Sequence, residues 1–181
     1  GTTGGGTGTT GGGTGTGTAT GSGTVSGSIG GQSILVRDAI FFNAYDGQGA
    51  VMGSVVALVD GPGACATMKN GVALGGSSGI SFTLLAFSGT GAVNPGVGTY
   101  QVGTPFGPGN YLMGGFGVQD QACQSTVTAL ASGSLTLTNR SATTATGHFN
   151  VTFGSSATTG SFSAAYCDLT AEELNRPQTC Q

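Results

Sequence analysis

A serine in a glycine-rich pentapeptide and a single histidine come nearest to catalytic chemistry in this sequence. Residues 75–79 match the Gly-x-Ser-x-Gly pattern of a nucleophile elbow, with Ser77 as the nucleophile. That pattern needs a strand before the serine and a helix after it, whereas here a strand pattern follows. A serine nucleophile also needs a base held by a third group, and His148 lies in a segment without a carboxylate. We therefore expect no enzyme activity.

Carboxylates that could hold a metal ion are few and lie apart along the chain. Asp46, Asp60 and Asp120 fall at expected strand ends or in loops, where calcium sites often find their oxygen ligands. No Asp-x-Asp-x-Asp-Gly run accompanies them, and turn formation explains Asp46 and Asp60 equally well. A zinc site at His148 would need further ligands. We expect no metal or cofactor, and the three aspartates are weak calcium candidates.

The four cysteines indicate an oxidising compartment. An even count without a C-x-x-C pair favours two disulfides over a zinc ribbon or a thioredoxin-like site. Four free, buried thiols are the alternative. Of the possible pairings we favour Cys167–Cys180, because the span between them is short, and Cys65–Cys123 is then the remaining pair.

The low charge of the chain excludes several partners. Only 6% of residues are charged, the net charge is −3, and Lys and Arg together number 4. Nucleic-acid binding and electrostatic attachment to anionic lipid both need several cations on one face. No apolar run reaches the roughly 18–20 residues of a membrane span. We expect no nucleic-acid partner, and membrane contact only through an N-terminal lipid anchor outside this sequence.

The N-terminal segment is almost entirely Gly and Thr. Such a segment cannot bury enough apolar surface to offset the entropy of ordering it. We therefore expect a disordered linker over residues 1–23 and one domain over residues 24–181. A chain that begins inside such a tether, without Met, is typical of a processed protein. We expect an extracellular or outer-surface location with a lipid anchor.

Beyond the linker, apolar residues alternate with polar ones or form short runs, which is typical of strands. In the C-terminal third, Leu135, Leu137 and the apolar residues of 149–153 alternate with polar residues. This alternation predicts an antiparallel three-strand meander with one buried face. Asp46-Gly47 predicts a hairpin turn. The expected strands are residues 24–29, 33–45, 51–60, 79–87, 98–102, 111–120, 126–131, 134–138, 146–153 and 159–166.

Two short helical turns interrupt this pattern. Residues 63–70 lie between a Pro-Gly start and a Gly stop. Thr170 and Glu173 form a capping box, and Pro177 ends the turn that follows. About ten short strands with almost no helix predict an all-β fold. We expect an antiparallel β-sandwich, with a β-barrel as the alternative.

Two features of the expected surface could support binding. Tyr100, Phe106, Tyr111 and Phe116 cluster in sequence around a Gly/Pro-rich loop. They form either a contact patch or part of the core. The Thr-rich polar face of the last three strands could bind ice or a polysaccharide, or could simply keep a low-charge sheet soluble.

Four segments carry a resemblance to a known group. They are Ala-Cys-Ala at residues 64–66, Asp-Gln-Ala-Cys at 120–123, the Ser-Gly-Ser-Leu-Thr-Leu-Thr strand at 132–138 and Thr-Gly-Ser-Phe-Ser-Ala-Ala-Tyr-Cys at 159–167. With the Gly/Thr spacer, this layout resembles the uncharacterised secreted lipoproteins of myxobacteria and related bacteria. The resemblance covers most of the domain. It implies a surface location, a lipidated Cys before the spacer and a sandwich fold, and it implies no activity.

These observations favour a surface-displayed or secreted, non-catalytic interaction or structural domain. Its partner would be a protein or glycan at the cell surface, met by loops near residues 46–49 and 103–110. Carbohydrate or ice binding through the Thr-rich strand faces is the alternative function. A hydrolase that uses Ser77 is the second alternative.

Overall fold

Strands make up most of the chain, as the sequence predicts. The computed structural model describes residues 20–73 and 75–181. It is mostly β, with two short helices. The strands are β1 (Ser22–Ser26), β2 (Asp38–Tyr45), β3 (Val51–Val59), β4 (Val72–Ala73), β5 (Ser78–Ser88), β6 (Gly91–Val93), β7 (Gly98–Val102), β8 (Gly109–Gln119), β9 (Ser125–Arg140), β10 (Thr144–Phe153), β11 (Ser156–Tyr166) and β12 (Thr179–Cys180). The helices are α1 (Ala64–Lys69) and α2 (Ala171–Leu174).

The C-terminal meander is confirmed. Strands β9, β10 and β11 pair in order and antiparallel. Leu135 lies opposite Phe149, and both are buried, as are Leu137 and Val151. Their neighbours in sequence face outward, because successive side chains of a strand point to opposite faces of the sheet. Alternation in the sequence therefore identified which face of this meander is buried.

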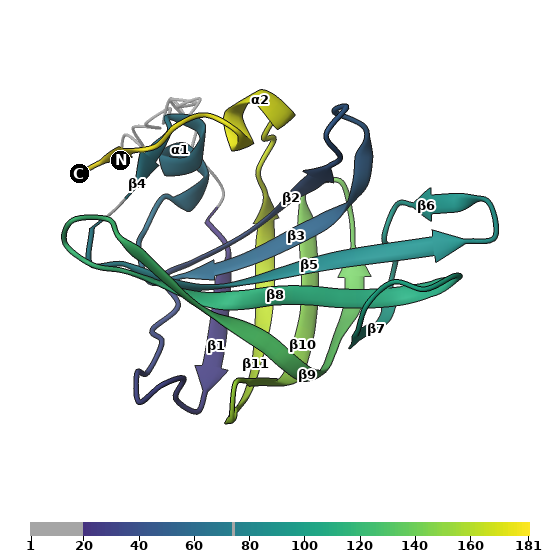
Figure 1. Cartoon of the computed structure of the whole chain (residues 1–181), viewed down its shortest axis with the longest axis horizontal. Coiled ribbons are helices and arrows are strands. Elements are labelled where there is room, and N and C mark those ends of the chain that lie inside the picture. The colour runs from purple at the N-terminus through teal and green to yellow at the C-terminus, as the bar shows by residue number, and fades with distance from the viewer. Residues whose placement is uncertain (1–19, 74) are drawn as a thin grey trace, which may run out of the picture.

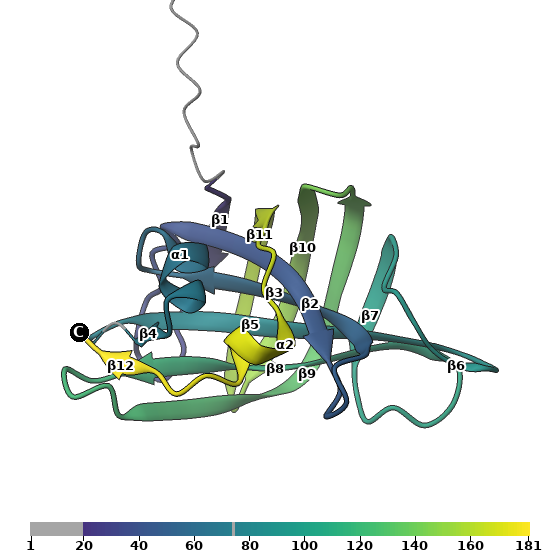
Figure 2. The same cartoon turned by 90° about the horizontal axis from the view of Figure 1, so that it is seen from above.

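The sheet is a single mixed sheet with ring-like hydrogen bonding. The order β1-β11-β10-β9-β7-β8-β5-β3-β2 is closed by pairing between β11 and β2. That closing pair is parallel, and so is the pair of β7 with β8. Strands β3, β5 and β8 cross over β1, β11 and β10 (Figures 1 and 2). The expected antiparallel β-sandwich, with two separate sheets, is therefore wrong. The closed hydrogen bonding is nearer to the alternative, a β-barrel.

Strand β9 explains why the two layers join. The sequence predicts two strands, 126–131 and 134–138, separated at Gly133. The structure has one strand, whose first part pairs with β8 and whose second part pairs with β10. Gly133 has φ 106° and lies so close to β10 that an added Cβ would be 2.2 Å from the Asn150 oxygen. Glycine thus permits a bend at this position without ending the strand.

The main core fills the space between the crossing layers. Its largest buried side chains include Tyr100, Phe82 and Phe153. Phe82 of β5 contacts Phe149 and Phe153 of β10, with ring centroids 4.9 and 6.3 Å apart. A smaller cluster lies on the other side of β2 and includes Cys167. It packs beneath the two helices.

Both predicted helical turns are present. In α2, Thr170 Oγ1 accepts from Glu173 N at 3.1 Å, and the Glu173 carboxylate accepts from Thr170 N at 2.8 Å. This is the expected capping box. Helix α1 has no side-chain cap on its own N-cap residue. Instead, the buried Asp38 carboxylate of β2 accepts from Ala64 N at 2.9 Å.

The predicted linker, residues 1–23, lies mostly outside the described residues. Its last residues, Ser22 and Gly23, belong to β1 and pair with Ser163 and Phe162 of β11. The sheet therefore begins two residues before the expected domain boundary. Ser22 and Gly23 carry no apolar side chain that could have predicted this start.

Two disulfides are present, and all four cysteines are bonded, as expected. The expected pairing is wrong, because Cys65 pairs with Cys167 and Cys123 pairs with Cys180. Cys167 follows β11, and its N–H donates to Phe41 O of β2, so the closing of the ring brings it near α1. The pairing of the strands, and not the separation of the cysteines in sequence, therefore decides which cysteines are bonded. Two disulfides suggest an oxidising, extracytoplasmic environment.

Candidate binding groove

The four aromatic residues expected near the Gly/Pro loop do not share one surface. Tyr100 and Phe116 are 1% and 3% exposed and belong to the core. Phe106 is 86% exposed in the loop before β8. Tyr111 is half-buried and meets Phe87 edge-on, with ring centroids 6.1 Å apart. A single contact patch of these four residues is therefore a wrong interpretation.

Two of the calcium candidates close hairpin turns. Asp46 lies between β2 and β3, and Asp120 between β8 and β9. In each turn, the Asp Oδ1 accepts from the N–H groups two and four residues later, at 2.8–2.9 Å. The residue three positions later has a positive φ, 83° at Gly49 and 57° at Cys123. The part of the chain that the structure describes has no cluster of three or more metal-ligating His, Cys, Asp or Glu side chains.

Ser77 and His148 lie in different parts of the ring. Ser77 is followed by strand β5, and its Oγ donates to Gln119 Oε1 at 3.2 Å. His148 is exposed on β10, opposite Thr136 of β9 and Ser161 of β11. Strands β5 and β10 are not neighbours in the sheet. The sequence pattern around Ser77 thus corresponds to a loop that leads into a strand.

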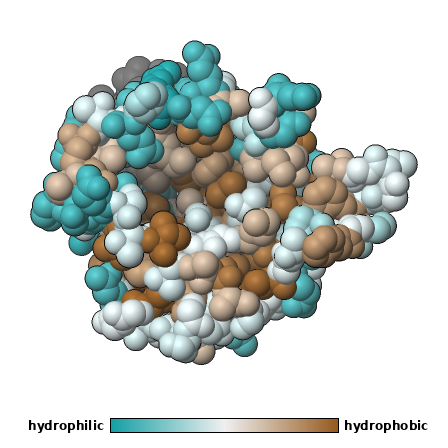
Figure 3. Space-filling view, in the orientation of Figure 1, coloured by the Kyte–Doolittle hydropathy of each residue, from teal (hydrophilic) through white to brown (hydrophobic). Residues whose placement is uncertain are grey.

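A groove of about 330 Å³ lies on the outer face of the sheet. Strands β3, β5, β8 and β9 form its floor, and α1 and β4 form one wall. Pockets that bind small molecules have volumes from about 300 Å³ upward. In Figure 3, hydrophobic residues are exposed on this side of the molecule, and strongly hydrophilic residues lie toward its periphery.

The floor of the groove is made of small residues in register. Gly79 of β5 lies opposite Gly117 of β8, with Val59 of β3 on one side and Val127 of β9 on the other. A Cβ added at Gly117 would meet no heavy atom within 4 Å. Gly117 therefore leaves the backbone of the floor open, whereas Val59 covers Gly79, where an added Cβ would be 3.0 Å from Val59 Cγ1.

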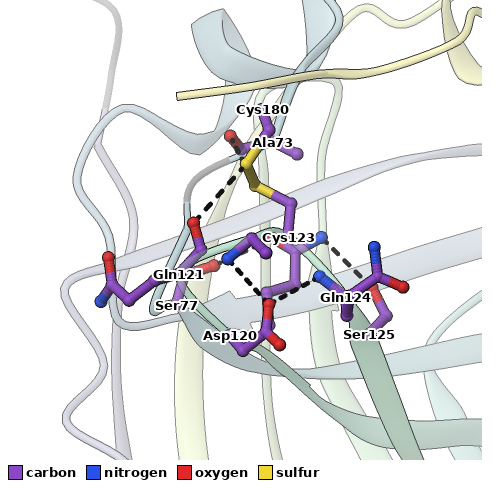
Figure 4. The surroundings of a disulfide bond; sticks show 10 residues. Ala73, Ser77, Asp120, Gln121, Cys123, Gln124, Ser125 and Cys180 are labelled. Carbon is purple, nitrogen blue, oxygen red and sulfur yellow. Dashed lines mark hydrogen bonds between the residues drawn. A yellow bond between two sulfur atoms is a disulfide. The ribbon is translucent and has the colours of Figure 1, made fainter.

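Two disulfides hold the α1–β4 wall and one end of the groove. Cys123, in the turn between β8 and β9, is bonded to Cys180 of β12, which pairs in parallel with Ala73 of β4 (Figure 4). The bond thus joins the hairpin end of the groove to the β4 side. Cys65, within α1, is bonded to the buried Cys167. The groove is consequently a fixed feature and does not depend on loop packing alone.

The groove has no charged side chain among the described residues that line it. Its polar groups are Ser, Thr and Gln side chains. Asp60, the third calcium candidate, lies beside it at the end of β3. Its carboxylate accepts from Ser78 N at 2.8 Å and from Ser78 Oγ at 2.7 Å. A neutral lining favours a neutral ligand, because an ion would lose its hydration without gaining a partner.

A second surface, the hydroxyl-rich face, covers the outside of β7, β9, β10, β11 and β1. Its central row is Thr99, Thr136, His148, Ser161 and Thr24, one residue from each strand. Hydroxyl groups of Thr99 and Thr136 lie 3.0 Å apart, as do those of Thr24 and Ser161. The adjacent row is Gln101, Ser134, Asn150, Thr159 and Ser26. The Thr-rich face expected from three strands thus extends across five.

A half-buried cation lies at the end of β9. The Arg140 guanidinium lies 5.8 Å from the Phe41 ring centroid and donates to Pro95 O. Burial lowers the pKa of Arg140, and Tyr100 and Tyr166 oppose that shift. Burial also raises the pKa of Tyr100, whose hydroxyl donates to a backbone oxygen. These contacts belong to the core and lie apart from the groove.

Sequence reasoning missed the groove, although a signal was present. Glycines at 79, 115 and 117 fall inside strands, where glycine is unfavourable unless something approaches the backbone closely. Only the strand register shows that these positions share one face.

Comparisons with protein-family models, with curated proteins and with solved structures find no match to this chain. No helix in residues 20–73 and 75–181 is long and apolar enough to cross a membrane.

Proposed function

We propose that this protein is a non-catalytic binding domain, displayed outside the cytoplasm, whose groove holds an uncharged ligand. The observation that carries the proposal is the groove itself. It is about 330 Å³ in volume, has a glycine floor and contains no charged lining residue among those described. The two disulfides support an extracytoplasmic location. Secretion and an N-terminal lipid anchor remain part of this proposal.

A groove of this kind stabilises a bound ligand through the apolar area removed from water, at about 25 cal/mol per Å². Because disulfides hold the α1–β4 wall and one end of the groove, less conformational entropy is lost there when the ligand enters. The fixed hydroxyl and amide groups then determine the orientation of the ligand. This division of roles suits a receptor-like or carrier domain at the cell surface.

The proposal is tested by a substitution that places a large side chain inside the groove. We expect Gly117→Leu to lower the affinity for a neutral solvatochromic dye at least about tenfold, because the added side chain occupies the open space above the floor. Fluorescence titration measures the affinity. The matched control is Gly47→Leu in the β2–β3 turn, where an added Cβ is also free of contacts. This control should bind the dye as the natural sequence does.

Circular dichroism and thermal unfolding establish that both variants keep the fold. If Gly117→Leu is folded and binds the dye unchanged, the groove is not the binding site and the proposal fails.

A second candidate function uses the hydroxyl-rich face, which we propose as a surface for a polysaccharide or for ice. The register of five neighbouring strands favours it, since polar side chains stand in rows across strands that lie about 4.8 Å apart. We expect His148→Lys to weaken binding to an insoluble neutral polysaccharide, or to reduce thermal hysteresis, by placing a charge at the centre of the face. Lys substituted for the exposed Gln48 is the control. Equal behaviour of the two variants would contradict this role.

A further inference from the structure

We infer that, when the groove holds no ligand, a second copy of this chain covers the outer face of β5 and β8. The two copies are related by a two-fold axis that crosses these strands. The dimer is additional to the ligand of the proposed function and does not depend on it. The symmetric placement of two rings and an open glycine supports it, together with exposed apolar side chains and the absence of charge.

The outer face of β5 and β8 has a centre of symmetry in its register. The two strands pair antiparallel and lie side by side across the molecule (Figure 1). The pair Thr83–Met113 is the middle one of the outward-facing pairs, and the Met113 side chain is 47% exposed. Four residues to either side, about 13 Å along the strands, lie the pairs Gly79–Gly117 and Phe87–Gly109.

One end of this face carries two aromatic rings. Phe87 and Tyr111 meet edge-on, with ring centroids 6.1 Å apart, and both side chains are half-buried. The Tyr111 ring lies beside Gly109, where an added Cβ would be 3.3 Å from Tyr111 Cζ. The Tyr111 hydroxyl donates to Gly107 O at 3.2 Å, which fixes the position of the ring. A pair of rings thus stands on the sheet four residues from its centre.

The other end of this face is open at the matching position. An added Cβ at Gly117 would meet no heavy atom within 4 Å. Apolar side chains lie on either side of the Gly79–Gly117 pair, namely Val59 of β3 and the 68% exposed Val127 of β9. On β8, a ring therefore lies beside the glycine four residues before Met113, whereas the glycine four residues after it is uncovered.

A two-fold axis across the strands at Thr83–Met113 brings these two ends together. A half-turn about an axis that lies between two facing sheets reverses the direction of the strands. The Tyr111 ring of one copy then faces the open Gly117 of the second copy, and the reciprocal contact forms at the same time. Contacts of this self-complementary kind are the commonest in homodimers.

The neighbouring strand β3 and the charge of the face agree with this arrangement. Val55 pairs with Thr83, so the same axis places the 46% exposed Val51 against Val59 of the second copy. Residues 70–119, which include all of β5 and β8, contain no Asp, Glu, Lys or Arg. Each chain has a net charge of −3, but this face brings no like charges together. The contact instead removes apolar side chains from water.

Sedimentation equilibrium of the full chain without ligand measures the dimer. We expect twice the mass of one chain at about 100 μM, where an interface with a micromolar Kd is almost fully formed. Met113→Asp should raise the dimer dissociation constant at least about tenfold, because the axis brings two carboxylates together. The matched control is Leu35→Asp, which changes a 66% exposed apolar side chain between β1 and β2. It should dimerise as the natural sequence does.

A cross-link tests the position of the axis. Met113→Cys adds a single free thiol, because the four natural cysteines are bonded to one another. A bismaleimide that spans about 10 Å, the distance between facing sheets, should join two chains at residue 113. Leu35→Cys at the same concentration should stay unlinked.

The dimer fails if the natural chain is a monomer at about 100 μM, or if a folded Met113→Asp variant dimerises unchanged. Saturating dye should shift the natural chain to the monomer, since ligand and second copy both occupy the space above Gly117. A dimer that binds the dye without dissociating would also overturn this arrangement.

Dye titration in dilute solution separates the dimer from the proposed function. Met113 does not line the groove, so monomeric Met113→Asp should bind the dye as the natural sequence does. Dye binding without a dimer overturns the dimer alone. A dimer without dye binding supports the dimer and removes the proposed function.

Discussion

At the scale of single residues, one glycine opens the groove, and two aspartates shape hairpin turns. Gly117 leaves the floor open, since a side chain there would fill the groove. Asp46 and Asp120 form the same type of turn in two hairpins, and Cys123 takes the position that Gly49 holds in the other. A left-handed conformation is unusual for a residue other than glycine. At Cys123 it accompanies the disulfide that clamps the groove.

Tyr100 makes the stability of the fold decrease with rising pH in the alkaline range. Burial raises its pKa above the ordinary 10.0, so the folded state holds this proton more tightly than the unfolded state. Its contribution to stability is therefore complete below about pH 10 and is lost as the pH rises toward the folded pKa. We expect the free energy of unfolding to fall above pH 10, and Tyr100→Phe to reduce that slope. Urea unfolding between pH 8 and pH 11 measures it.

The same substitution should cost about 1 kcal/mol at neutral pH, because it removes the 2.7 Å hydrogen bond to Gly96 O. Tyr111→Phe, outside the core, is the control. If the free energy of unfolding falls equally steeply with pH in Tyr100→Phe and in the natural sequence, Tyr100 is not the source of the pH dependence. Part of the slope should remain in the variant, since burial also raises the pKa of Tyr166.

At the scale of elements, one buried carboxylate joins three segments. Asp38 opens β2, and its Oδ1 accepts from Ala39 N at 2.8 Å and from Gly21 N at 3.2 Å. Its Oδ2 accepts from Ala64 N at the start of α1. Asp38 is 2% exposed, so water cannot replace these partners. This residue positions α1, and α1 forms a wall of the groove.

We expect Asp38→Asn to lower the free energy of unfolding by about 3 kcal/mol, because an amide NH₂ would face a backbone N–H that now has an acceptor. Chemical denaturation measures the loss. The control is Asp46→Asn, whose single oxygen keeps both turn hydrogen bonds while its NH₂ faces solvent. The control should lose less than about 1 kcal/mol. Equal losses in the two variants would show that burial of Asp38 has no special role.

At the scale of the whole molecule, the interleaved disulfides join distant parts of the ring. The bonds span 102 and 57 residues. In the chain-entropy account, a cross-link that closes a loop of this length lowers the entropy of the unfolded chain. Each bond then raises the free energy of unfolding by about 4–5 kcal/mol. Such a contribution matters in a domain with few charged residues, where ion pairs add little to stability.

Peptide mapping without reduction tests the pairing. Trypsin cleaves after Arg37, Lys69 and Arg140 but not before Pro177, so residues 38–69, 70–140 and 141–181 form separate segments. We expect mass spectrometry to find all three joined by disulfides. Further cleavage after the glutamates of α2 should separate a Cys65–Cys167 species from a Cys123–Cys180 species. A free 141–181 segment with an internal bond would contradict the structure.

The sequence alone determined the properties that depend on neighbours along the chain. Alternation fixed the meander and its buried face, Asp46-Gly47 fixed a hairpin, and Thr170 with Glu173 fixed a helix start. Composition indicated bonded cysteines and a low-charge surface. Each of these properties follows from local backbone geometry or from the amino-acid composition, and none of them depends on contacts between distant residues.

Only the tertiary structure decided which distant segments meet. Closing the ring through β11 and β2 brought Cys167 near α1, and the pairing of β5 with β8 aligned Gly79 with Gly117. Packing between the layers placed Tyr100 and Phe116 in the core. Pairing between strands depends on the register of segments far apart in sequence, and a shift of one residue would turn every side chain to the other face. The groove exists because of that register, so no reading along the chain could locate it.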